Sequence, residues 1–277
     1  MQITLIMKTS IKYLAVLFIG LYSFKSYSVQ LPKVKNDNQV KVSNFAFTYG
    51  EKLQYRMHYG PFNAGYATLE IQNEPVLVNG RRTFNIKASA KSSGSIDFLY
   101  NKVRNDYETY MDEEYLVPLK YTKKVEEGKY RDSDFALFDR DANKINAKKA
   151  SIDNVSNQVQ DLLSVYYWTR VWDVKNAKVG DTYPTVFYMD GKVYNYAIKY
   201  LGKEVVKIDA GKFNAIKIRP QVKTGDFFKN EDALTIWVSD DDNHIVLKVE
   251  SEIFVGAVAM TLTDYKNLKN PTTSKIK

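Results

Sequence analysis

The stretch LQYRMHY, residues 53–59, decides the fold class. Its odd positions are apolar and its even positions are polar. Because successive side chains of a β-strand point to opposite faces, this alternation predicts a strand with one buried face and one wet face. Residues 60–65 predict a six-residue loop, after which Ala67, Leu69 and Ile71 alternate with polar residues. Together the two stretches predict a β-hairpin.

Hairpin signals recur along the chain. Asn79-Gly80 precedes the alternating residues 84–88, and Asp190-Gly191 separates the apolar stretches 183–189 and 193–200. An Asp-Gly or Asn-Gly pair between apolar stretches is a strong signal for a tight hairpin turn. Sequential hairpins predict an antiparallel meander of about a dozen strands, which must curl, split into two packed sheets or close. We therefore predict a mostly β fold, an antiparallel meander curled into a barrel-like or two-layer sheet.

One segment has a different period. Five apolar residues between positions 157 and 172 have the spacing of one face of a helix: Val159, Leu162, Leu163, Tyr166 and Tyr167. Such spacing is typical of an amphipathic helix that packs on a core. We expect one main α-helix, at about residues 157–172, covering one opening or face of the sheet.

The N-terminus predicts export. Lys8 and Lys12 precede an apolar run at residues 13–24, and Ser26-Tyr27-Ser28 follows it. This order is typical of a secretory signal peptide, here residues 1–28. The run is shorter than the ~20 residues of a bilayer span, although an uncleaved anchor is the alternative. After cleavage we expect a protein that does not span the membrane, located in the periplasm or associated with the outer membrane.

The remaining chain predicts one domain. Residues 29–44 are polar and without periodicity, which predicts a flexible leader, and residues 269–277 predict a disordered tail. Between them, residues 45–268 contain no Pro/Gly/Ser-rich linker and no clear repeat. We therefore expect a single β-rich domain at residues 45–268.

Composition argues against several kinds of chemistry. The chain has no Cys and two His, so we expect no disulfide, no Cys-linked lipid, no metal site and no cofactor. Removing residues 1–28, with three Lys and no acid, lowers the formal net charge from +8 to +5. This mild, dispersed charge does not predict a nucleic-acid partner. With no nucleophile elbow, we expect no catalytic residue and no enzyme. Residues 139–143 resemble the start of a calcium loop, but turn chemistry explains them better.

Aromatic residues supply the candidate binding site. The chain contains 21 Tyr, which suit the half-buried surfaces of sheets and also line ligand sites. Two polar residues, Asp161 and Arg170, interrupt the apolar helical segment, where they either bond the sheet or touch a ligand. The candidate ligand-binding residues are Tyr55, Tyr59, Tyr107, Trp237, Asp161 and Arg170.

Several motifs in order resemble a known family. They are Gly50-Glu51-x-Leu53-x-Tyr55, Gly65-x-Ala67-x-Leu69, Gln160-Asp161-Leu162-Leu163-Ser164-x-Tyr166-Tyr167-x-x-Arg170, Gly211-Lys212-Phe213, Ile218-x-Pro220, and Trp237-Val238-Ser239-Asp240-Asp241 with Gly256, Leu262 and Tyr265. Across residues 47–266 this pattern resembles the bacterial family called domain of unknown function 3108. The resemblance implies a secreted or envelope protein of the kind common in Gram-negative bacteria, and it implies no activity.

These observations favour a periplasmic or envelope binding or carrier module. A concave, aromatic-lined sheet would hold a lipid or a glycan. One alternative is a carboxylate-dependent enzyme acting on envelope polysaccharide, and another is a structural or interaction protein of an envelope complex with protein partners. An outer-membrane β-barrel is a further alternative, although the C-terminal strand lacks the terminal aromatic residue typical of that class.

Overall fold

Strands dominate the architecture. The computed structural model describes residues 40–94, 97, 102–221, 233–252 and 257–277. The predicted signal peptide, and residues 29–39 of the predicted leader, lie outside the described residues. In chain order the described elements are β1 (Lys52–Tyr59), β2 (Phe62–Ile71), β3 (Val76–Val78), β4 (Arg81–Ser92), β5 (Val103–Asp112), β6 (Pro118–Glu127), β7 (Tyr130–Asp139), β8 (Lys144–Ala147), β9 (Ser151–Ile152), α4 (Ser164–Thr169), β10 (Thr182–Met189), β11 (Lys192–Ile208), β12 (Gly211–Pro220), β13 (Leu234–Ser239), β14 (Val246–Glu252), β15 (Ala257–Lys266) and β16 (Lys275–Ile276).

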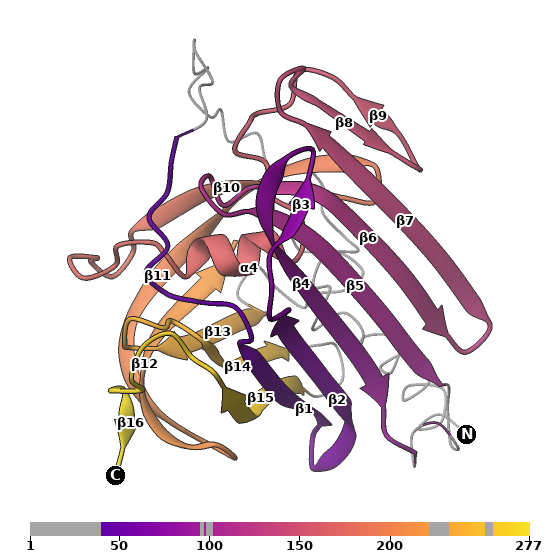
Figure 1. Ribbon diagram of the computed structural model, residues 1–277. Coiled ribbons are helices and arrows are strands. Elements are labelled where there is room, and N and C mark those ends of the chain that lie inside the picture. The colour runs from indigo at the N-terminus through magenta and orange to yellow at the C-terminus, as the bar shows by residue number, and fades with distance from the viewer. Residues whose placement is uncertain (1–39, 95–96, 98–101, 222–232, 253–256) are drawn as a thin grey trace.

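The described strands all belong to one sheet, and their pairing is antiparallel. Its order is β10-β11-β12-β13-β14-β15-β1-β2-β4-β5-β6-β7-β8-β9, with β3 paired to β4 and β16 paired to β12. Sequential hairpins account for most neighbours, as the meander predicts. The exceptions are the pairing of β2 with β4, that of β16 with β12, and that of β15 with β1, which joins the last long strand to the first. Figure 1 shows the sheet curled around α4, with β4–β7 on one side and β10–β13 on the other. The prediction of a curled, barrel-like antiparallel sheet is confirmed.

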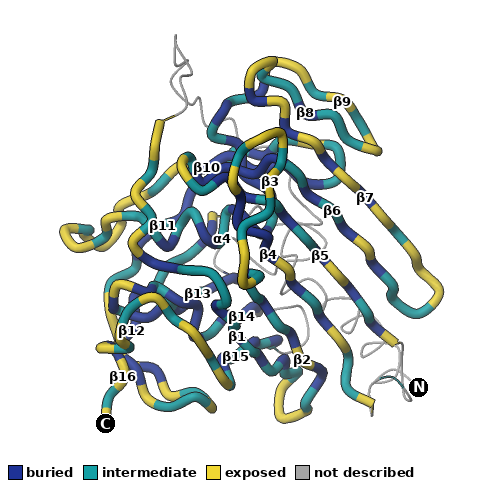
Figure 2. The backbone as a smooth tube through the Cα atoms, in the orientation of Figure 1, coloured by how far each residue is buried: buried dark blue, intermediate teal, exposed yellow. Residues whose placement is uncertain are grey.

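The first hairpin has the predicted faces but a shorter turn. In β1, Leu53, Tyr55 and Met57 are buried while the intervening polar residues are partly exposed. The same alternation of buried and exposed positions runs along β6 and β7 in Figure 2. The predicted six-residue loop is wrong, because β2 begins at Phe62 and only residues 60–61 form the turn. A bulge in the β1–β2 pairing after Met57 allows both strands to continue into this tight turn.

The two ends of the curled sheet meet through side chains. Lys123 on β6 is 5% exposed, and its ammonium lies 2.8 Å from Asp132 on β7 and in contact with Asp190 in the β10–β11 turn. Lys149, in the β8–β9 turn, reaches the same two carboxylates at 2.8 and 3.0 Å. We call Lys123, Asp132, Lys149 and Asp190 the ionic clasp. It joins β6 and β7 to the β10–β11 hairpin, elements that share no backbone ladder in the described sheet.

The helix is much shorter than predicted. The expected helix at about residues 157–172 is wrong in extent, because α4 has six residues. Gln160 is in an extended conformation: its N–H donates to Val186 O at 2.9 Å, and its carbonyl accepts from Tyr188 N at 2.7 Å. This short parallel bridge covers the open edge of β10. The apolar stripe therefore combines an extended segment and a short helix, and both bury their apolar residues in the same core.

The C-terminal residues 269–277, predicted to be a disordered tail, lie against the domain instead. Residues Lys275–Ile276 form β16 on β12. Ser274 is buried, and its hydroxyl donates to Asp241 Oδ2 at 2.6 Å. Polar composition misled the prediction here, because this segment is held by hydrogen bonds rather than by apolar burial. No helix among the described residues is long and apolar enough to cross a membrane.

Candidate functional site: an apolar cavity beside the helix

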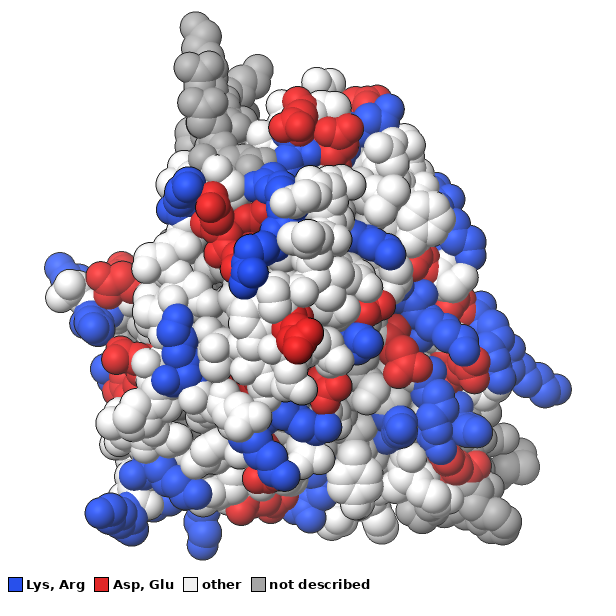
Figure 3. Space-filling view, viewed as in Figure 1, with Lys and Arg blue, Asp and Glu red and all other residues white. Residues whose placement is uncertain are grey.

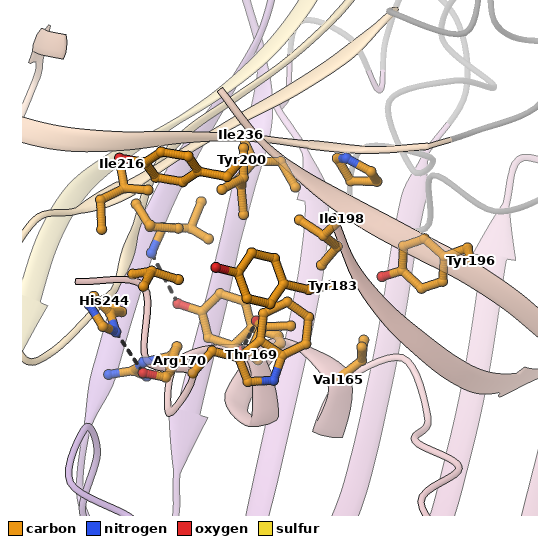
Figure 4. A pocket seen from close by; sticks show the side chains of 17 residues that line it. Val165, Thr169, Arg170, Tyr183, Tyr196, Ile198, Tyr200, Ile216, Ile236 and His244 are labelled. Carbon is orange, nitrogen blue, oxygen red and sulfur yellow. Dashed lines mark hydrogen bonds between the residues drawn. The ribbon is translucent and has the colours of Figure 1, made fainter. Parts of the chain in front are cut away.

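A cavity of about 170 Å³ lies between α4 and the inner face of β10–β13. Figure 4 shows its aromatic side chains converging on a common space between the helix and the strands. The lining has one aromatic residue from α4, one from the segment after it and three from β10 and β11, namely Tyr166, Trp172, Tyr183, Tyr196 and Tyr200. The opposite wall is mostly branched aliphatic: Ile198, Ile216, Ile218, Ile236, Val238 and Val246.

Strand alternation explains why these residues share a face. Ile216 pairs with Val238 and Ile218 pairs with Ile236 across β12 and β13, and all four line the cavity. The intervening Trp237 therefore points to the outer face of the sheet. The site is built by a period-two pattern on adjacent strands, with α4 closing it from the inside.

The segment after α4 forms one end of the cavity. The rings of Trp172 and Tyr183 are stacked, with centroids 5.2 Å apart and planes at 22°. Trp168 packs edge-on against Trp172 at 4.9 Å. Trp172 and Tyr183 are both partly exposed, and the residues between them include exposed Asp173 and Asp181. This end of the cavity therefore faces water.

Arg170 also lines the cavity, but its guanidinium is already bound. Two nitrogens contact Glu51, at 2.5 and 2.8 Å, in a buried bidentate pair. Nε donates to Asn243 O at 2.8 Å and Nη2 donates to Ala46 O at 3.1 Å. Arg170 is 2% exposed, so this network ties the end of α4 to β1 and to the β13–β14 turn. Of the two roles considered for Arg170, the contacts support the structural one.

His244 and Thr169 also line the cavity, and each has an internal partner. His244 Nδ1 lies 2.7 Å from the carbonyl of Arg170, and because a carbonyl only accepts, this nitrogen is the donor. The hydroxyl of Thr169 donates to Tyr166 O at 2.9 Å. The polar atoms near α4 therefore hold the helix in place.

Asp161, the other polar candidate, lies outside the cavity. Its Oδ1 accepts from the backbone N–H groups of Leu163 and Ser164, both at 2.8 Å, and its Oδ2 accepts from the hydroxyl of Thr109 on β5. Burial raises the pKa of Asp161 to about 6, although these hydrogen bonds oppose the shift. The carboxyl thus starts the turn that leads into α4 and attaches it to β5.

The aromatic candidates lie at four separate places. Tyr55 is buried, and its hydroxyl donates to Val246 O at 3.2 Å, next to the cavity wall. Tyr107 is buried on β5, and Tyr59 is partly buried against the core. Trp237 lies on the outer face, where its Nε1 donates to Glu204 at 2.5 Å. None of these four aromatic candidates lines the cavity.

The sequence did contain a signal for the observed lining. Tyr196, Ile198 and Tyr200 are spaced by two, as expected for one face of the strand that was predicted at residues 193–200. Val193 and Ala197 on the opposite face are also apolar, and Ala197 is buried, so the period did not show which face was inside. Trp172 and Tyr183 had no such signal, because their stack depends on the path of the loop between them.

Other polar clusters have structural partners. Within the described residues, no group of three or more His, Cys, Asp or Glu side chains is arranged to hold a metal ion. Asp139 accepts from the backbone N–H of Ala142 at 2.9 Å, in agreement with turn chemistry for residues 139–143. On the outer face, positive and negative side chains are interspersed, as Figure 3 shows. A cross-strand row there runs Lys52, Glu70, Lys87 and Glu108, with neighbouring charges of opposite sign.

Fold and site together define a class: a β-barrel-like protein whose curled antiparallel sheet encloses a short helix and an apolar cavity. A crystal structure of a beta-barrel-like protein of domain of unknown function DUF1849 from Brucella abortus has this kind of fold, with a TM-score of 0.50 and 10% identity over 80% of this chain and 99% of that chain. The chain itself belongs to the DUF3108 family of proteins of unknown function, whose match spans residues 54–263.

Two further solved structures match with lower scores. One is a candidate lipoprotein from Parabacteroides distasonis, with a TM-score of 0.34 and 11% identity over 80% of this chain and 97% of that chain. The other is a candidate exported protein with a YmcC-like fold from Bacteroides fragilis, with a TM-score of 0.32 and 8% identity over 80% and 98% of the two chains. The comparison with curated proteins found no match.

Proposed function

We propose that this protein is an exported binding or carrier module of the cell envelope that holds the apolar part of a lipid. The observation that carries the proposal is the cavity beside α4, whose lining is almost entirely aromatic and branched aliphatic. Such a lining favours an apolar ligand, since burying apolar surface contributes roughly 25 cal/mol per Å². Export, and a periplasmic or outer-membrane-associated location, are supported by the signal-like N-terminal sequence and by the family resemblance.

The lining favours a hydrocarbon over a glycan. A buried sugar presents several hydroxyls, and each one without a hydrogen-bond partner costs on the order of 1–3 kcal/mol. Near α4, the polar side chains of Thr169, Arg170 and His244 are already bound to groups of the protein. A hydrocarbon needs no such partner, so it fits the described walls better than a sugar does.

The cavity volume limits how much of the ligand is enclosed. An apolar cavity of about 150 Å³ is known to hold one benzene molecule. At about 170 Å³, this cavity accommodates one ring or a short segment of an acyl chain. The proposed module therefore grips part of its ligand while the rest remains at the surface.

The test uses an uncharged aromatic probe, of which a part enters the cavity. We expect N-phenyl-1-naphthylamine to bind the purified protein with a rise in fluorescence. Replacing Ile236 by Trp fills the cavity and should weaken probe binding at least tenfold. A second filling variant, Val238→Phe, serves if the first one folds poorly. Mass spectrometry of lipids that co-purify with the protein provides an independent measurement.

The matched control adds the same side chain outside the cavity. Val205 on β11 is 51% exposed and does not line the cavity, so Val205→Trp should bind the probe as the unaltered protein does. If circular dichroism shows that a cavity-filling variant is folded, and that variant binds the probe as tightly as the unaltered protein does, the proposed site is refuted.

A further inference from the structure

Among the described residues, the basic side chains of the cavity lining come from the C-terminal end of α4 and from the β13–β14 turn that contacts it. Arg170 and His244 are the only lining residues with basic side chains, and no lining residue is acidic. The Arg170 guanidinium faces Glu51 in the bidentate pair, with its Nε on Asn243 O. This cation is therefore already neutralised, and a ligand carboxylate or phosphate that reached it would have to compete with a buried protein carboxylate.

The loop that follows Trp172 has a mixed set of charges in water. The loop between Trp172 and Tyr183 contains exposed Asp173, Lys175, Lys178 and Asp181. Asp173 accepts from the backbone of Lys175 at 3.0 Å, and Asp181 accepts from the backbone of Lys178 at 2.8 Å. These turns hold the carboxylates in place, and the two acids are balanced by two lysines. The loop therefore has no excess charge that would select a head group by its sign.

Tyr183 connects this loop to the cavity. Its ring lines the cavity and stacks on Trp172. Burial, followed by the nearby charges of Asp181 and Asp173, raises the pKa of its phenol. Tyr183 thus lies where the apolar lining ends and the solvated carboxylates begin, as expected for an amphipathic side chain at the mouth of an apolar site.

We propose that the cavity takes the uncharged hydrocarbon end of a single-chain amphiphile, while its head group stays in water beside the Trp172–Tyr183 stack. This inference rests on the proposed function and specifies the ligand class and its orientation. The physical reason is desolvation: moving an ionic head group into this lining without a free partner is far more costly than leaving it in water. Recognition then depends on the hydrocarbon, and head groups of different charge are accepted alike.

The test compares three ligands with the same chain and different head groups. Undecanoate, decanol and decyltrimethylammonium, which share a ten-carbon alkyl chain, are each used to displace the naphthylamine probe at 150 mM salt and pH 7.5. We expect their dissociation constants to agree within about threefold, because each buries the same apolar surface. A preference of more than tenfold for the anion or for the cation would overturn the inference, since it would require a charged partner inside the site.

A second measurement reports where the head group lies. The nitroxide of 4-decanoyloxy-TEMPO is reduced by ascorbate in water, and we expect the bound ligand to be reduced as fast as the free ligand. Protection of the bound nitroxide would place the head group inside and overturn the inference. Failure of the proposed function gives a different result: no ligand would displace the probe, or Ile236→Trp would bind all three as the unaltered protein does.

Discussion

At the scale of single residues, the polar groups inside the barrel mostly hold α4 in position. Arg170 and Glu51 form one attachment, and Asp161 with Thr109 forms another. The two differ in chemistry. The first pairs opposite charges, whereas the second is one buried carboxyl held by hydrogen bonds, with a pKa raised from 3.8 to about 6. A raised carboxyl pKa means that the folded state favours the protonated form more than the unfolded chain does.

The pH dependence of folding follows from this shift. Between about pH 4 and pH 6 the folded state retains the Asp161 proton that the unfolded chain has released, so the free energy of unfolding falls as the pH rises through this window. Asp161→Asn keeps the hydrogen-bonding shape without ionising. Urea denaturation gives the free energy of unfolding of the variant minus that of the unaltered protein. We expect this difference to increase by on the order of 2–3 kcal/mol between pH 4 and pH 7.

A matched variant should act in the opposite direction. Thr109→Val removes a hydrogen bond that lowers the pKa of Asp161. In this variant the free energy of unfolding should therefore continue to fall to a higher pH than in the unaltered protein. If Asp161→Asn has the same pH profile as the unaltered protein, the carboxyl does not titrate in this window and the argument fails.

At the scale of elements, the conformation of a short segment depends on the strands and turns beside it. Val159 begins the apolar spacing typical of a helix, yet the next residue, Gln160, pairs with β10 because that strand otherwise has an open edge. The C-terminal residues have polar composition, yet they pair with β12 and bind the β13–β14 turn. In both cases backbone groups of an existing strand or turn supply the partners that the segment lacks locally.

Removing the C-terminal segment should therefore destabilise the domain. Deleting residues 270–277 removes β16, the Ser274 bond to Asp241 and the bonds between Asn270 and Asn243. At roughly 1 kcal/mol for each buried hydrogen bond, we expect the free energy of unfolding to fall by about 3–5 kcal/mol. Deleting exposed Lys277 alone is the control and should leave it unchanged. Equal stability of all three proteins in urea would show that the segment is not part of the folded unit.

At the scale of the whole molecule, closure depends on side chains. The described ladder runs from β10 to β9 without a backbone pairing between its two ends. The ionic clasp and the hydrogen bond from Tyr188 to Asp134, at 3.0 Å, join these ends instead. A sheet closed in this way loses fewer contacts on opening than a barrel with a continuous ladder. The β10–β11 hairpin, which forms part of the cavity wall, is therefore the part most able to separate.

Breaking the clasp should loosen one side of the molecule selectively. Lys123→Met leaves Asp132 and Asp190 with Lys149 as their remaining clasp cation, and we expect a loss of about 3 kcal/mol in the free energy of unfolding. Hydrogen exchange should become faster in β10 and β11 than in β1 and β2.

The neighbouring residue provides the control for this effect. Lys124 is exposed on the other face of β6 and pairs only weakly with Glu126, at 3.3 Å. Lys124→Met should change stability by no more than about 0.5 kcal/mol. Uniform acceleration of exchange across all strands in Lys123→Met would contradict a local role for the clasp.

The sequence by itself determined most strands, the two alternating faces of each and most hairpins, because a period of two and turn residues are local properties that each strand carries whatever it packs against. It also showed the family through the order of its motifs, from Tyr55 to Leu262. Only the tertiary structure decided the extent of α4, the pairing of the C-terminal residues and which aromatic residues line the cavity. Trp237 and Tyr196 are both strand aromatics, yet Tyr196 lines the cavity whereas Trp237 is buried on the other face of the sheet, against Glu204, since the curvature of the sheet and the path of α4 set which face encloses space.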